Sequence, residues 1–135
     1  MACDILLVED NLDDLFLIRQ GLAAAEFDHR LRHHVGGTNT ADEIVMALRA
    51  EAKPDVLILD YHLPAWTAPE LLSVLNASEV LGGVEVIVLG GMISPESSVA
   101  LREMGANQII AKPFDLEGFW ELGIQVREAC KRRSR

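Results

Sequence analysis

Charged residues follow three separate apolar runs of this chain, and together they have the composition of a site for a metal ion and a phosphoryl group. They are Glu9 and Asp10 after residues 5–8, Asp60 after residues 56–59, and Lys112 after residues 109–111. If the runs are neighbouring parallel strands, these side chains meet at the sheet edge where open α/β sheets bind ligands. Carboxylate oxygens suit Mg²⁺ or the similar Mn²⁺, and a lysine ammonium can hold a phosphoryl oxygen.

The chemistry expected of this set is attack by the Asp60 carboxylate on a phosphorus atom, which forms an acyl phosphate. A cation bound by Glu9, Asp10 and Asp60 would neutralise the phosphoryl oxygens, and Lys112 would hold the group from a second side. Nothing else in the chain competes well as a nucleophile. Because three close carboxylates repel one another, we expect the metal-free site to hold another cation or to show raised carboxyl pKa values.

Short apolar runs alternate with longer segments of helical pattern, which predicts βαβ units and a parallel sheet. The expected strands are residues 5–10, 31–35, 55–60, 84–89 and 108–111. The expected helices are residues 11–26, a second helix after a capping box at 40–43, then 69–76, 94–105 and 115–130. Without a repeat or a second core, we expect one domain over residues 1–135, with its core at about 3–130 and a basic tail at 131–135.

The composition argues against several classes of protein. A chain of 135 residues fits one domain, and 50% hydrophobic with 24% charged residues is a globular profile. A net charge of −9 argues against a general nucleic-acid binder. No apolar stretch approaches the roughly 20 residues of a membrane span, and the N-terminus lacks a signal-peptide pattern. We therefore expect a cytoplasmic protein without nucleic-acid or membrane partners.

The two cysteines, Cys3 and Cys130, lie near opposite ends of the chain, without a CxxC motif or a His/Cys cluster. We therefore expect neither a zinc site nor a disulfide framework, but two buried or unused thiols in a reducing compartment. The basic tail is expected to be a solvated helix end, with a partner contact or linker as the alternative.

Over essentially its full length the chain resembles the receiver domain of bacterial two-component response regulators. The matching segments are residues 6–11 (Leu-Leu-Val-Glu-Asp-Asn), Asp60 with Leu63-Pro64, Gly105-Ala106, and Lys112-Pro113-Phe114. The resemblance implies that Asp60 is the phosphoacceptor and that Lys112 contacts the phosphoryl group, with a cis bond between Lys112 and Pro113. It also implies that Glu9 and Asp10 hold Mg²⁺ with Asp60 and the main-chain carbonyl of His62. Residues 8–11 and 16–19 are most similar to small stand-alone receivers that pair with phytochrome-type kinases.

Two switch positions depart from the family. Receivers carry Thr or Ser at the end of the fourth strand, where this chain has Gly90, and Tyr or Phe three residues before the lysine, where it has Ile109. A hydrogen bond to a charged group is worth roughly 1.5–3 kcal/mol, which is similar to an allosteric coupling of about 1–3 kcal/mol. Losing the hydroxyl could therefore remove most of the switch, unless the Gly91 N–H compensates in part. We expect phosphorylation with weakened or altered output.

Other residues near the predicted site are open to two interpretations. His62 would lie beside the path of the hydrolytic water and could tune the lifetime of the acyl phosphate, or it is an exposed loop histidine. Met92 would face the same opening. Trp66 either contacts a partner or packs over its loop, whereas Trp120 is expected in the core with Phe119. The remaining histidines, residues 29, 33 and 34, are expected at the surface or the sheet edge.

The predicted fold is a doubly wound, flavodoxin-like (βα)5 sandwich with strand order 2-1-3-4-5. The preferred function is a stand-alone receiver, with no enzymatic activity beyond slow self-dephosphorylation, that takes a phosphoryl group onto Asp60 from a histidine kinase or phosphotransfer protein. It would signal through protein contacts or a homodimer, using the face of the fourth helix, fifth strand and fifth helix. The alternatives are a phosphorylation-independent pseudo-receiver and a Mg²⁺-dependent phosphatase with an aspartyl nucleophile. Such phosphatases usually carry a second acid where this chain has His62.

Overall fold

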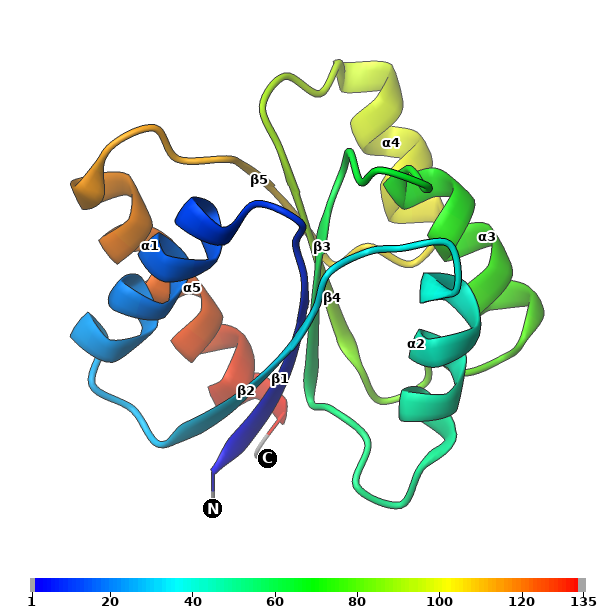
Figure 1. Ribbon diagram of the computed structural model, residues 1–135, viewed down its shortest axis with the longest axis horizontal. Helices are drawn as coiled ribbons and strands as arrows, with labels where there is room; N and C mark the ends of the chain where they lie inside the picture. The colour runs from blue at the N-terminus through cyan, green and yellow to red at the C-terminus, as the bar shows by residue number, and fades with distance from the viewer. Residues whose placement is uncertain (1, 134–135) are drawn as a thin grey trace.

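The computed structural model describes residues 2–133, which form a parallel five-stranded sheet between two layers of helices (Figure 1). The strands are β1 Cys3–Val8, β2 His29–His34, β3 Val56–Asp60, β4 Glu85–Gly90 and β5 Gln108–Ala111. The helices are α1 Leu12–Ala24, α2 Thr40–Arg49, α3 Ala68–Ala77, α4 Pro95–Glu103 and α5 Leu116–Arg133. The strand order β2-β1-β3-β4-β5 confirms the predicted (βα)5 sandwich.

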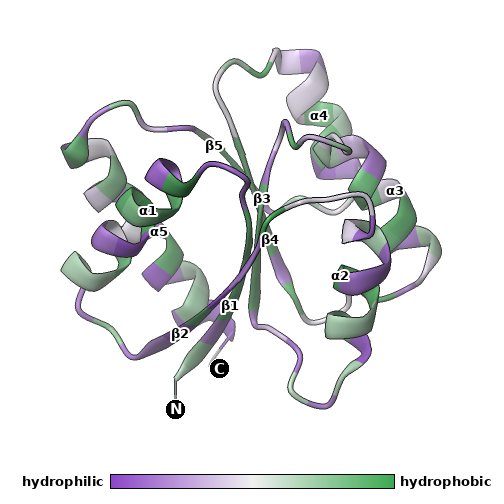
Figure 2. Cartoon of the chain, viewed as in Figure 1, coloured by the Kyte–Doolittle hydropathy of each residue, from purple (hydrophilic) through white to green (hydrophobic). Residues whose placement is uncertain are grey.

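The central strands are buried on both faces, which explains why they read as unbroken apolar runs. In β1, Ile5 and Leu7 pack in the layer with α1 and α5. Their neighbours Leu6 and Val8 pack on the opposite face with α2, α3 and α4. Figure 2 shows the hydrophobic positions gathered along the strands and on the helix sides that face them. The outer strand β2 is only partly buried.

Strand register brings the predicted site together at one edge of the sheet. The last paired residues are Val8 with Leu59, Asp60 with Leu89, and Gly90 with Ala111. Glu9, Asp60, Gly90 and Lys112 therefore stand at the carboxyl ends of four neighbouring strands, β1, β3, β4 and β5.

Most helix ends follow the local signals in the sequence. The Ser94 side chain accepts a hydrogen bond from the Ser97 N–H at the start of α4, and Asp115 accepts one from the Gly118 N–H at the start of α5. Gly105, with φ of +106°, lies just after α4, in a conformation that favours glycine.

The capping box predicted at residues 40–43 is wrong. Thr40 already lies inside α2, and its hydroxyl donates to the Gly37 carbonyl instead of accepting from the helix. The capping box is found at α3, where the Thr67 hydroxyl accepts from the Glu70 N–H and the Glu70 carboxylate accepts from the Thr67 N–H. Both segments have the residue types of a capping box. Thr67 occupies the N-cap position of α3, whereas α2 begins one residue earlier than the pattern requires, with Asn39 as its N-cap.

Helices α1 and α5 pack closely because each presents a glycine to the other. A Cβ atom on Gly21 would lie 2.1 Å from the Phe119 carbonyl oxygen, and one on Gly123 would lie 2.0 Å from the Gly21 carbonyl oxygen. Phe119 is buried in this layer, but Trp120 is 46% exposed, so its predicted core position is wrong. The next residue along a helix is turned about 100° away, which takes Trp120 off the buried side of α5.

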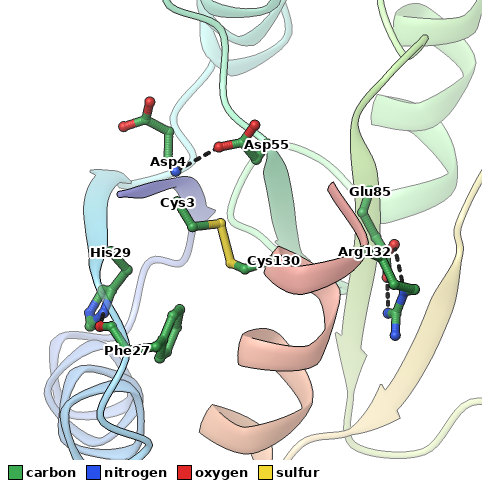
Figure 3. The surroundings of a disulfide bond; sticks show 8 residues. All are labelled: Cys3, Asp4, Phe27, His29, Asp55, Glu85, Cys130 and Arg132. Atoms are coloured by element: carbon green, nitrogen blue, oxygen red, sulfur yellow. Dashed lines mark hydrogen bonds and ion pairs between the residues drawn. A yellow bond between two sulfur atoms is a disulfide. The ribbon is translucent and has the colours of Figure 1, made fainter. Parts of the chain in front are cut away.

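A disulfide joins Cys3 to Cys130, with Cα atoms 5.8 Å apart (Figure 3). The prediction of two free thiols is therefore wrong. β1 begins at the amino edge of the sheet, and α5 runs back along α1 to end at the same edge, as Figure 1 shows. This contact could not be predicted from the sequence, because the two cysteines are 127 residues apart and only the complete fold brings the first strand and the last helix together.

No helix within residues 2–133 has the length and apolar character needed to cross a membrane. The described part of the basic tail continues α5 as far as Arg133, and Arg132 pairs with the buried Glu85 (Figure 3). Residues 134 and 135 of the predicted tail lie outside the described residues.

Candidate phosphoacceptor and metal site

Three carboxylates meet at the carboxyl edge of the sheet. Glu9, Asp10 and Asp60 each offer an oxygen atom, and these oxygens lie within 4.8 Å of one another. Glu9 is fully buried and Asp60 is 7% exposed, whereas Asp10 is open to solvent. An all-oxygen set with one solvent-facing member matches a cation such as Mg²⁺ or Mn²⁺, which keeps several water ligands.

Lys112 places its ammonium group directly against this cluster. Its Nζ atom lies 2.8 Å from Glu9 Oε1, 3.1 Å from Asp60 Oδ2 and 2.9 Å from Asp14 Oδ2. The predicted residues Glu9, Asp60 and Lys112 are thus brought together. Asp14 was not predicted, although it lies in the first turn of α1, which begins two residues after the acidic pair.

Charge and burial shift the pKa values of Glu9 and Lys112 in this site. Burial raises the pKa of Glu9 to about 7, and the Asp60 carboxylate adds to the rise while Lys112 opposes it. Burial alone would lower the pKa of Lys112, but Glu9, Asp14 and Asp60 together raise it above its ordinary value. The lysine therefore stays charged and is the cation that the crowded carboxylates were expected to hold.

The backbone of Glu9 is fixed by the edge strand β2. Its N–H donates to the His34 carbonyl at 3.0 Å, and its own carbonyl lies 2.6 Å from His33 Nε2. Glu9 Oε2 accepts from the Asn11 N–H at 3.3 Å. His33 and His34 do lie on the edge strand, as predicted, but His33 also supports the site backbone, which the sequence pattern did not reveal.

The bond between Lys112 and Pro113 is trans, since none of the peptide bonds within residues 2–133 is cis. The cis bond implied by the family resemblance is therefore wrong for this structure. Trans is the intrinsically favoured isomer of an X–Pro bond, and with it Lys112 reaches all three carboxylates.

The first switch position, Gly90, is packed against a neighbouring side chain. A Cβ atom on Gly90 would lie 2.4 Å from Ile93 Cδ1 and 2.6 Å from Ile93 Cγ1. Ile93 therefore occupies the space where a Thr or Ser side chain would begin. Beside it, a hollow of about 640 Å³ opens between the β4–α4 loop and β5, with Gly90, Met92 and Ile109 in its lining. Met92 is 99% exposed at its mouth.

His62 and Trp66 lie in the loop after β3. His62 is exposed, and its ring meets the Tyr61 ring edge-to-face with the two ring centroids 4.7 Å apart. Its backbone forms an isolated antiparallel β-bridge with Thr67. Trp66 is half-buried, and its ring N–H donates to the Thr38 carbonyl at 3.3 Å. Trp66 thus reaches across to the β2–α2 loop and packs against the core cluster, which favours the packing interpretation over the partner contact.

The chain matches the family model of the response regulator receiver domain over residues 5–122. It is 30% identical to the transcriptional regulatory protein PrrA of Mycobacterium leprae, over 96% of this chain and 50% of that protein. It is similar to the phosphorylated cyanobacterial phytochrome response regulator RcpA, with a TM-score of 0.78, 25% identity, and coverage of 95% and 93% of the two chains. The Mn²⁺-bound form of response regulator Rcp1 has a TM-score of 0.75 at 23% identity, with coverage of 93% and 92%, which shows the shared fold.

The chain spans about half the length of the PrrA relatives it matches, so their whole-protein activities are not carried over. The family match itself covers most of the 135 residues, from β1 into α5. With its strand order and its acidic edge, the chain belongs to the response regulator receiver domain family.

Proposed function

We propose that this receiver accepts a phosphoryl group on Asp60 from a phosphohistidine of a histidine kinase or phosphotransfer protein. An Asp60 carboxylate oxygen attacks phosphorus, the phosphorus–nitrogen bond breaks, and the histidine nitrogen leaves with a proton. The observation that carries the proposal is the position of Asp60, which lies between two further carboxylates and the Lys112 ammonium at 3.1 Å.

Glu9, Asp10 and Asp60 would hold Mg²⁺ or Mn²⁺, with the His62 main-chain carbonyl as a fourth ligand by family resemblance. The bound cation would supply positive charge to the oxygens of the transferred group. Lys112 holds the phosphoryl oxygens from the other side, and its raised pKa keeps it charged for that role. Asp60 rather than Glu9 is the proposed nucleophile, because Asp60 is 7% exposed whereas Glu9 is fully buried.

Intact mass after incubation with Mg²⁺ and a small phosphodonor tests this proposal. The wild-type protein should gain the mass of one phosphoryl group, and Asp60→Asn should not gain it. Another receiver in the same buffer verifies the donor, and a time course started within seconds detects a short-lived adduct. Absence of any adduct under these conditions favours the second candidate function, a pseudo-receiver whose binding ignores phosphorylation.

The pseudo-receiver is supported by one observation, the packing of Ile93 into the space beside Gly90. With neither a hydroxyl at position 90 nor an aromatic ring at position 109, the β4–α4 loop lacks the usual contact to the phosphoryl group. We propose altered output on this ground, with His62 and Met92 as candidate residues for tuning the adduct lifetime. The phosphatase alternative predicts turnover of a generic phosphate ester beyond one equivalent, which the release of inorganic phosphate measures.

Signalling is proposed to run through the face of α4, β5 and α5, by contact with a partner or by homodimer formation. Exposed apolar side chains on α4 and α5 support this face: Val99, Trp120 and Ile124. A cytoplasmic location is part of the same proposal. Disulfides are uncommon in reducing compartments, so the Cys3–Cys130 bond argues against a cytoplasmic location. Titration of free thiols in protein isolated under non-reducing conditions tests this point. Two free thiols would fit the cytoplasmic location, and none would fit the disulfide.

A further inference from the structure

Asp14 differs from the other two carboxylates that contact Lys112, because it is not one of the three that can hold a metal ion. Its Oδ2 atom lies 2.9 Å from Nζ, between Glu9 Oε1 at 2.8 Å and Asp60 Oδ2 at 3.1 Å. The group whose oxygens approach one another within 4.8 Å contains Glu9, Asp10 and Asp60, but not Asp14. Asp14 therefore binds the lysine without sharing the metal position.

The fold directs Asp14 toward the lysine. Asn11 caps α1 by accepting hydrogen bonds from the N–H groups of Asp13 and Asp14, at 2.9 and 3.0 Å. This cap fixes the first turn, in which Asp13 faces solvent while the Asp14 side chain is only 26% exposed. Both acids complement the helix dipole, so the dipole does not explain why Asp14, of these two, forms an ion pair with Lys112.

An ammonium group has three N–H donors, and here three carboxylate oxygens lie within 3.1 Å of Nζ, of which Asp60 Oδ2 accepts a hydrogen bond. A cation held by Glu9 and Asp60 would draw on their oxygens, so Lys112 would lose part of two contacts and keep the third. We propose that Asp14 is the positioning residue of Lys112: it holds one N–H of the ammonium so that the other two point at the phosphoryl group on Asp60. This inference rests on the proposed function and deepens it.

The test compares Asp14→Asn with Asp13→Asn, which removes the same charge from the same helical turn without touching Lys112. At saturating Mg²⁺, Asp14→Asn should slow phosphorylation by a small donor about five- to tenfold, the scale of one ordinary intramolecular hydrogen bond. Asp13→Asn should stay within about twofold of wild type, since an exposed charge is largely screened. Asp14→Glu, which keeps the carboxylate, should recover part of the rate.

A second readout does not depend on phosphorylation. In nitrogen-15 NMR, the Lys112 ammonium signal should be visible in wild type and Asp13→Asn, both with and without Mg²⁺, because ion pairing slows its exchange with water. Asp14→Asn should lose the signal once Mg²⁺ is added. Equal rates in the two variants, a faster Asp14→Asn protein, or an ammonium signal that survives in Asp14→Asn with Mg²⁺ would each overturn the positioning role. A wild type that takes no phosphoryl group refutes the proposed function instead, and the NMR comparison still decides on Asp14.

Discussion

Glu9 is a fully buried carboxyl group whose pKa is raised to about 7, so its protonation changes within ordinary buffers. The folded protein binds this proton more tightly than the unfolded chain, in which a glutamate titrates near 4.5. The contribution of Glu9 to the free energy of unfolding is therefore complete below pH 4.5 and is lost as the pH rises through about 7.

This dependence can be isolated with Glu9→Gln, which cannot titrate. In urea unfolding with Mg²⁺ removed by a chelator, the stability of wild type relative to Glu9→Gln should fall between pH 4.5 and 7 and level off above. Adding Mg²⁺ should reduce the fall, because a cation stabilises the ionised form. A stability difference between the two proteins that stays constant across this range would contradict the raised pKa.

Gly90 and Ile93 allow a second test at the level of single residues. In Gly90→Thr, the new Cβ would meet Ile93 Cδ1 at 2.4 Å, and overpacking of this kind costs about 1–3 kcal/mol. Ile93→Ala removes the obstructing atoms. The double variant should therefore lose less unfolding free energy than the two single variants lose in sum. Urea unfolding of the four proteins in this cycle measures the coupling, and strict additivity would show that the two positions do not compete for space.

The principal site residues could be predicted because each stands at the carboxyl end of an apolar run. Glu9, Asp60 and Lys112 stand out as charges after apolar runs, and parallel order alone brings them to one edge. Asp14 and His33 gave no such signal, since a first-turn acid and an edge-strand histidine have ordinary structural roles. Their contacts with Lys112 and with the Glu9 carbonyl depend on tertiary placement.

At the scale of whole elements, the α1–α5 contact depends on glycine. In Gly21→Ala, the added Cβ would stand 2.1 Å from the Phe119 carbonyl oxygen, a backbone atom that moves only with its helix. We expect a net loss of about 1–3 kcal/mol, despite the roughly 1 kcal/mol by which alanine favours a helix over glycine. Gly37→Ala, where a Cβ would meet nothing within 4 Å, is the control and should lie within about 0.5 kcal/mol of wild type. Chemical denaturation compares them, and equal stabilities would refute the close contact.

Element type and order followed from hydrophobic periodicity, but finer details did not. The strand predicted at 31–35 is β2 at His29–His34, because pairing with Cys3–Val8 of β1 sets its limits. The residue types of a capping box occur before both α2 and α3, yet only Thr67 and Glu70 form one. Trp120 follows Phe119 on the same helix but lies off its buried side. In each case a local pattern admitted two arrangements and long-range packing selected one.

At the scale of the whole molecule, the Cys3–Cys130 disulfide closes a loop with a sequence separation of 127 residues. Crosslinking so long a loop lowers the entropy of the unfolded chain and stabilises the fold by about 3–5 kcal/mol. A dithiol reductant should therefore lower the unfolding free energy of wild type by about that amount. The variant Cys3→Ala with Cys130→Ala is the control, because the reductant has no bond to break in it.

The same reduction should leave the chemistry at the other end of the sheet unchanged. The disulfide lies at the amino edge of the strands (Figure 3), whereas Asp60 and Lys112 lie at or beyond their carboxyl ends. Below the unfolding transition, the rate of phosphorylation by a small donor should therefore agree within about twofold between oxidised and reduced protein, since distant sites couple weakly. Two free thiols in the folded protein before any reductant is added would contradict the Cys3–Cys130 disulfide on which this prediction rests. A rate that follows the redox state instead would show that α5 transmits the bond to the phosphoacceptor edge, through the same contact with α1 that Gly21 and Gly123 make possible.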